Sequence, residues 1–174
     1  MPKRSVAELK DIATELRKTA VTMIYEAQSG HPGGSLSAAD FVAALYFKYM
    51  NVDPKWEDRD RFVLSKGHVA PIQYAALGKL GYFEESVLHT LRKEGSPLQG
   101  HPSMVKCPGI DISTGSLGQG LACAVGMAFA GKRDKNPSGL TAWSVTARHR
   151  KARSGKRQTR RTSIRSTTLL SSLM

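Results

Sequence analysis

Three histidines share one local setting, a tight turn rich in glycine and proline. His31 lies in "SGHPGG", His68 in "SKGH" and His101 in "QGHP". Histidine can donate a hydrogen bond, accept one, or titrate near neutral pH, so these turns suit proton handling or the recognition of hydroxyl and phosphate groups. Their spacings of 37 and 33 residues match no short metal-ligand motif, which disfavours a metal site. For any one of them, the alternative is a turn histidine that is exposed by chance. This alternative is weaker for three histidines that share the same Gly-His context.

A second candidate is the glycine-rich stretch "GSLGQG" at residues 115–120, directly before an apolar segment with helical character. Free backbone N–H groups at the start of a helix attract phosphate. The stretch is not a Walker loop, since no Lys-Ser/Thr pair follows, and its glycines follow G-x-x-G-x-G instead of the dinucleotide pattern G-x-G-x-x-G. Close packing of the helix explains the glycines equally well.

The elements that must hold these groups alternate between helix and strand. Ser5 and Glu8 form a capping box before a helical apolar pattern, and Gly30, Pro32 and the next glycines end that helix. The pattern predicts one buried strand, Phe62 to Leu64, with His68 just beyond its C-terminal end. A long Gly/Pro-rich loop is expected over 95–113. Helices are predicted at 6–27, from Ser37 to about Met50, and at 71–80, 84–94 and 121–133.

This alternation predicts an α/β fold, in which ligands bind at the C-terminal ends of parallel strands. Only one convincing strand precedes residue 140. We therefore expect an incomplete parallel sheet with flanking helices.

The charge is concentrated in one segment. The chain has a formal charge of +12, and nine of its 26 Lys and Arg residues lie between Arg148 and Arg165 without one Asp or Glu. Residues 1–139 carry 17 basic against 14 acidic residues, an ordinary balance. Two cysteines, no apolar run of membrane-spanning length and no signal-like start make a cytoplasmic, membrane-free protein the expectation.

Three longer stretches, taken together, resemble a known family. "SGHPGGSLSAADFVAALYF", "DRFVLSKGH" and "GHPSMVKCPGIDISTGSLGQGLACAVGMA" are similar to the N-terminal region of transketolases, above all the form split into N-terminal and C-terminal subunits. The resemblance covers about residues 8–137. It implies a thiamine-diphosphate-binding fold, with Mg²⁺ on the diphosphate, and transfer of a two-carbon ketol unit between sugar phosphates.

The resemblance also implies partners and residue roles. A C-terminal transketolase subunit would supply the pyrimidine-binding half of the site, in a heterotetramer or dimer. His31 and His101 match the histidines that contact the substrate, and His68 matches the histidine on the cofactor side. The loop that lines the cofactor corresponds to Gly115, Ser116 and Leu117, where single-chain transketolases usually carry Pro in place of Ser116.

The family pattern breaks after Pro137. Transketolases continue with a strand, G-D-G-E, a helix with W-E-A and a strand of the type D-N-L-I-V-F-V-D. The Asp of G-D-G-E is a metal ligand in this family, and an Asn just after the last strand is another. None of these motifs is present, and the segment offers no carboxylate to a hard cation. We therefore assign no metal ligand and expect the chain to be inactive.

A shifted reading frame accounts for the break. Read one base out of register, the codons of "AWSVTAR" permit M-V-G-D-G-E, those of "RHRKARSGKRQ" permit A-Q-E-G-Q-V-W-E-A-A-N, and those of "STTLLSSLM" permit D-N-L-I-V-F-V-D. We expect residues 1–137 to form a partial thiamine-diphosphate-binding domain and 138–174 to be a disordered, out-of-frame tail. The alternatives are a non-catalytic module that pairs with a transketolase subunit, and a basic tail that binds nucleic acid without sequence preference.

Overall fold

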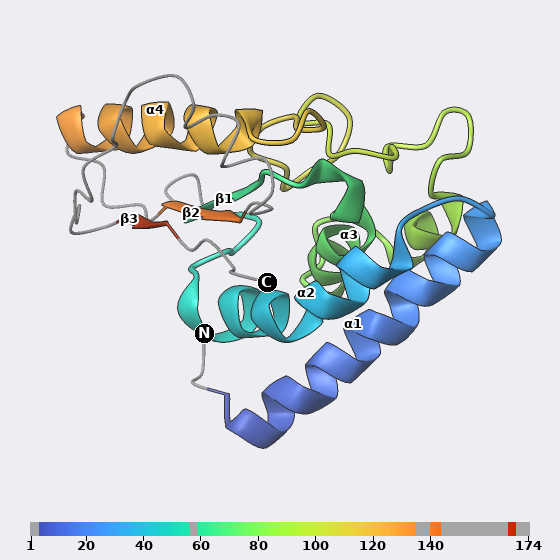
Figure 1. Cartoon of the computed structure of the whole chain (residues 1–174). Coiled ribbons are helices and arrows are strands. Elements are labelled where there is room, and N and C mark those ends of the chain that lie inside the picture. The colour runs from blue at the N-terminus through green and yellow to red at the C-terminus, as the bar shows by residue number, and fades with distance from the viewer. Residues whose placement is uncertain (1–3, 56–58, 135–139, 144–166, 170–174) are drawn as a thin grey trace.

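The computed structural model describes residues 4–55, 59–134, 140–143 and 167–169. Figure 1 shows a small sheet with α4 on one face and α1, α2 and α3 on the other, so the architecture is α/β, as the sequence predicts. None of the described helices is long and apolar enough to cross a membrane. In chain order the elements are α1 (Val6–Ala27), α2 (Pro32–Ala44), the π-helix η1 (Leu45–Tyr49), β1 (Arg61–Leu64), the 3₁₀ helix η2 (Gly67–Val69), α3 (Ala70–Lys79), the 3₁₀ helix η3 (Glu85–Thr90), α4 (Gln119–Arg133), β2 (Leu140–Trp143) and β3 (Thr167–Leu169).

β1 is buried on both faces, which explains its unbroken apolar run. Phe62 and Leu64 belong to the core formed with α1, α2 and α3. Val63 belongs to a separate cluster with Ala124 and Ala128 of α4. Successive side chains of a strand point to opposite faces, and a strand covered on both faces needs apolar residues at every position.

The sheet has the order β1-β2-β3 with parallel pairing throughout. Arg61 is paired with Leu140 and Leu64 with Trp143, and Leu140 is in turn paired with Thr167. Both later strands lie in the segment 138–174, for which the sequence predicted disorder. The remainder of that segment lies outside the described residues, so the boundary at residue 137 stays a prediction.

The predicted capping box at the start of α1 is confirmed. The Ser5 hydroxyl accepts a hydrogen bond from the Glu8 backbone N–H at 3.3 Å, and the Ser5 backbone N–H donates to the Glu8 carboxylate at 2.7 Å. These bonds satisfy N–H groups that have no partner inside the helix. The buried stripe of α1 consists of Ile12, Ala13, Leu16, Ala20 and Met23.

The predicted start of the second helix at Ser37 is wrong, because α2 begins at Pro32. Proline is well suited to the first helical position, where its missing N–H is not needed. Gly34 lies inside the helix for a packing reason, since a Cβ atom there would lie 2.2 Å from Cγ1 of Val69. The helix continues into η1, whose wider turn buries the consecutive residues Leu45, Tyr46 and Phe47.

The helix predicted over 84–94 is also wrong, since only the short 3₁₀ helix η3 forms there. The Thr90 hydroxyl donates to the Val87 carbonyl at 2.7 Å and contacts the Ser96 hydroxyl at 2.7 Å. Such local side-chain bonds compete with helical ones. Beyond them Arg92 adopts a left-handed conformation, with φ of 61°, which turns the chain away from a helical path.

The long loop over 95–113 contains neither helix nor strand, as predicted. It is fixed to the start of β1 by Asp111, whose side chain is 3% exposed and accepts from the Phe62 backbone N–H at 2.8 Å. The same carboxylate contacts Arg59 at 2.8 Å and Arg61 at 3.3 Å. The loop is therefore held in place by a buried carboxylate, although it lacks regular structure.

Candidate functional site

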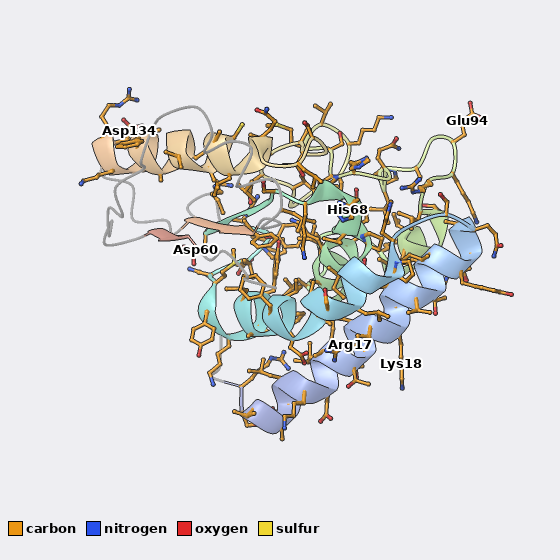
Figure 2. The ribbon with its side chains drawn as sticks, in the orientation of Figure 1. Arg17, Lys18, Asp60, His68, Glu94 and Asp134 are labelled. Carbon is orange, nitrogen blue, oxygen red and sulfur yellow. The ribbon has the colours of Figure 1, made fainter. Side chains whose placement is uncertain are left out.

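The three turn histidines converge at the C-terminal end of β1. His31 is the residue before α2, His68 lies in η2 directly after the strand, and His101 lies in the long loop. The imidazole rings of His31 and His68 meet edge to face, with 5.0 Å between their centroids. Figure 2 shows His68 between the end of the strand and α3. Segments far apart in the chain thus deliver three imidazoles to one place.

The electrostatics of His68 show that His101 belongs to the same cluster. Burial lowers the pKa of His68 below its usual value, because an imidazolium loses hydration there, and the charges of His31, Lys66 and His101 lower it further. Burial, Arg92 and His31 likewise lower the pKa of His101. At neutral pH these two imidazoles are therefore neutral, each with one nitrogen to donate and one to accept.

The predicted cofactor loop lies directly against this cluster. A Cβ atom on Gly115 would lie 3.4 Å from Cδ2 of His101, so the ring of His101 packs on the backbone of Gly115. The preceding Thr114 donates from its hydroxyl to the Leu64 carbonyl at 2.7 Å, which fixes the loop to the last residue of β1. Leu117 is half-buried and Ser116 is exposed. The structure therefore brings all six predicted site residues to the same edge of the sheet.

Ser65 holds the start of α4 at this edge, a role that the sequence analysis missed. Its buried hydroxyl accepts from the Leu121 backbone N–H at 3.0 Å, which satisfies one of the free N–H groups at the helix start. Gly120 makes the approach possible, because a Cβ there would lie 2.9 Å from Cα of Ser65. A serine directly after a predicted strand was the available sequence signal, but nothing in the sequence links it to the glycine-rich helix start.

Two cationic side chains complete the surroundings of the histidines. Lys66 is 8% exposed, and burial lowers the pKa of its ammonium group. Arg92 lowers the pKa of His101. Lys66 lowers the pKa of His68 and Arg92 lowers that of His101, and two cationic side chains beside the histidines favour an anionic ligand. Neither residue was predicted from the sequence.

Across the described parts of the chain, no three His, Cys, Asp or Glu side chains are arranged to hold a metal ion. This applies to the histidine cluster as well.

Comparison with known proteins identifies the family. The family model described as "Transketolase, thiamine diphosphate binding domain" matches residues 9–144, most of the chain. The chain belongs to the transketolase family. Membership confirms the resemblance on which the sequence analysis relied, and it agrees with an α/β thiamine-diphosphate-binding fold.

Several curated relatives are transketolases or their subunits. The chain is 47% identical over 134 residues to the 6-deoxy-6-sulfo-D-fructose transketolase subunit SqwG of Clostridium sp. (strain MSTE9), a match that covers 75% of this chain and 49% of that protein. It is 47% identical over 122 residues to one of the subunits of the apulose-4-phosphate transketolase of Phocaeicola vulgatus, covering 68% and 43%. The human transketolase is 48% identical over 127 residues, covering 71% and 20%. The chain thus spans half or less of each of these relatives.

Solved transketolases share the fold. The enzyme from Leishmania mexicana superposes with a TM-score of 0.75 and 33% identity, over 83% of this chain and 23% of that one. The enzyme from Campylobacter jejuni gives a TM-score of 0.77 and 30% identity, over 84% and 25%. The arrangement of helices around the small sheet is therefore that of the transketolase family.

Proposed function

We propose that residues 1–137 are part of the thiamine-diphosphate-binding subunit of a transketolase, which transfers a two-carbon ketol unit between sugar phosphates. The observation that carries the proposal is the convergence of His31, His68 and His101 beside Gly115 at the C-terminal end of β1. In α/β folds this edge is where ligands bind. Family membership supports the reaction class, and the histidines supply groups suited to it.

His31 and His101 are proposed to contact the substrate. Both are exposed, so a ligand can reach their rings. Because the pKa of His101 is lowered, its imidazole can accept a proton from a sugar hydroxyl or donate a hydrogen bond to a developing negative charge at neutral pH. Transfer between two sugars needs both abilities in one site.

His68 and the segment Gly115, Ser116 and Leu117 are proposed to hold the cofactor. Thiamine diphosphate, when bound, supplies the carbanion chemistry that the side chains of a protein lack. Its diphosphate suits a site surrounded by Lys66 and the histidines, where cationic and neutral nitrogen groups gather. The backbone of Gly115 can approach a ring closely because it carries no side chain.

We infer that the chain lacks the metal half of this site. The last acidic residue in the printed sequence is Asp134, so residues 135–174 offer no carboxylate to Mg²⁺. A diphosphate without its metal keeps unneutralised charge, which supports the proposal that this chain is inactive. The family match ends at residue 144, thirty residues before the last printed residue, which supports a change of reading frame close to this point.

A partner subunit is part of the proposal. Two of the relatives are named as transketolase subunits, and this chain aligns with less than half of each. The site as described uses one edge of one sheet, so a second domain can close it from outside. We propose a C-terminal transketolase subunit for this role and sugar phosphates as substrates.

The test compares two chains, each mixed with a C-terminal transketolase subunit. One has the amino-acid sequence given above, and we call it the printed chain. The other is translated in the shifted frame after the codon for Pro137. With Mg²⁺, thiamine diphosphate, a ketose phosphate and an aldose phosphate, we expect ketol transfer only from the second chain. His31→Asn and His101→Asn in that chain should each lower the rate about 10²- to 10⁴-fold.

Two results would contradict the proposal. One is transfer by the printed chain, and the other is a soluble restored chain that stays inactive with every ketose phosphate tried. The gene offers an independent check across the codons for Lys135 to Met174. If no single insertion or deletion there opens a transketolase frame, the frameshift explanation is wrong.

A further inference from the structure

Arg92 lies where two of the histidine turns approach each other. Its left-handed backbone, with φ of 61°, reverses the chain after η3, and its backbone N–H donates to the Leu98 carbonyl at 2.9 Å. A non-glycine residue in this conformation is uncommon and needs surrounding contacts to persist. This bond closes the reversal two residues before Gly100.

The side chain of Arg92 reaches both turns. Its Nη1 donates a hydrogen bond to the Ser29 hydroxyl at 3.0 Å, two residues before His31. Its guanidinium also lies against Gly100, directly before His101, where a Cβ atom would lie 2.7 Å from Cζ. The planar guanidinium therefore spans the gap between the turn before His31 and the turn before His101.

The charge of Arg92 also acts on His101. The groups that face the His101 imidazole are Arg92 after η3, His31 before α2 and His68 in η2, while the cofactor loop contributes the backbone of Gly115. Arg92 is the strongest charge among those that lower the pKa of His101, second only to burial. The same side chain thus contacts the turn before His101 and, after burial, lowers the pKa of its imidazole.

We propose that Arg92 is a positioning residue, whose guanidinium joins the turn before His31 to the turn before His101 and so fixes the two imidazoles relative to each other. The inference rests on the proposed function only in assigning these imidazoles to the substrate. Lysine cannot replace Arg92 fully, because a single ammonium cannot lie flat on Gly100 and also donate to Ser29 in a fixed direction.

The experiment is a histidine side-chain NMR titration on the full chain, without cofactor, substrate or partner. Resonances are assigned with His→Asn variants, and four substitutions are compared. Arg92→Gln removes the charge and the bridge, Arg92→Lys keeps the charge, and Ser29→Ala removes only the acceptor. Lys93→Gln is the matched control, since it loses the same charge at the exposed neighbouring position.

We expect Arg92→Gln to change the chemical shifts of both His31 and His101 and to move the His101 titration to higher pH. Arg92→Lys should change the shifts of both rings while the His101 titration stays near that of the unmodified chain. Ser29→Ala should change the His31 shifts and leave the His101 titration in place. Lys93→Gln should leave both rings unchanged.

The proposal is overturned if Arg92→Gln alters His101 alone, because the effect would then be purely electrostatic. It is also overturned if Arg92→Gln leaves the chemical shifts of both rings unchanged, as Lys93→Gln should. The same holds if Ser29→Ala leaves the chemical shifts of His31 unchanged. If the Arg92 variants do not fold, the chemical shifts of His31 in the Ser29→Ala variant test the proposal. Since no arm measures activity or cofactor binding, failure here and failure of the proposed transketolase function can be told apart.

Discussion

The two faces of β1 are packed very differently. On the helical face, Phe62 and Leu64 lie in a large core shared with α1, α2 and α3, in which Tyr46 meets Phe62 edge to face at 5.5 Å. On the opposite face, the buried side chains among the described residues are Val63, Ala124 and Ala128, beside half-buried neighbours. Phe129 of α4 remains 60% exposed. Among the described side chains, one face of β1 thus has a large core and the other a thin layer.

The candidate site uses segments from both faces of β1. His31 and His68 are attached to α2 and η2, which belong to the well-packed face, while the loop Gly115 to Leu117 leads into α4 on the thin face. Regions with few buried contacts open locally at lower free energy than the core does. We therefore expect the histidines to be held more firmly than the cofactor loop.

The largest effect should come from the helical face. Phe62→Ala removes a fully buried ring from the main core and should lower the free energy of unfolding by about 3–5 kcal/mol. Val63→Ala, the neighbouring substitution on the thin face, should cost about 1–2 kcal/mol, because fewer methyl groups leave a smaller cavity. Urea unfolding measures the free energy of unfolding of both variants. Equal losses would contradict the difference in packing between the two faces.

The next effect concerns the loop that carries His101. Asp111→Ala removes the carboxylate that joins this loop to β1 and leaves Arg59 without its 2.8 Å partner, at a cost of about 2–3 kcal/mol. Asp111→Asn keeps an acceptor for the Phe62 N–H and should cost less. If the two variants unfold at the same urea concentration, the backbone bond contributes nothing and the lost ion pairs account for the whole effect.

A smaller loss of stability is expected at α4, and it should distinguish the two faces of β1. Ser65→Ala removes the acceptor for the Leu121 N–H and should cost about 1 kcal/mol. Hydrogen exchange should accelerate in α4 and stay unchanged in α1, α2 and α3. The control is Ser86→Ala, an exposed serine of η3. Faster exchange in α1 after the Ser65 substitution would show that α4 does not open on its own.

The smallest effect is a dependence of stability on pH. The folded-state pKa values of His68 and His101 lie below the ordinary value of 6.5, so the unfolded chain binds more protons under acidic conditions. The free energy of unfolding should therefore fall as the pH drops through 6.5 and below, and this loss should shrink in a His68→Asn, His101→Asn double variant. A double variant with the same pH profile as the parent would exclude these two residues as the cause.

Structural features that depend on residues close together in the chain could be predicted from the sequence. The capping box at Ser5 and the apolar run at Phe62 to Leu64 were read correctly, because caps and buried strands are encoded within a few positions. The shared Gly-His context identified the three imidazoles. The start of α2 at Pro32 was missed, since the glycines after it were read as breakers when Gly34 in fact serves contact with Val69.

What could not be predicted depends on contacts between distant segments. Arg92 reaches Ser29, which lies 63 residues away in the chain, and Ser65 reaches Leu121, 56 residues away. Neither pair carries a recognisable spacing. The roles of the six predicted site residues come from family resemblance, and their convergence at one edge of the sheet required the structure.

The most direct test of the account is calorimetric titration of thiamine diphosphate in the presence of Mg²⁺. The printed chain and the chain translated in the shifted frame after Pro137 should be titrated side by side. The account predicts saturable, Mg²⁺-dependent binding by the restored chain and none by the printed chain, whose residues 135–174 contain no carboxylate. Mg²⁺-dependent binding of thiamine diphosphate by the printed chain would contradict it.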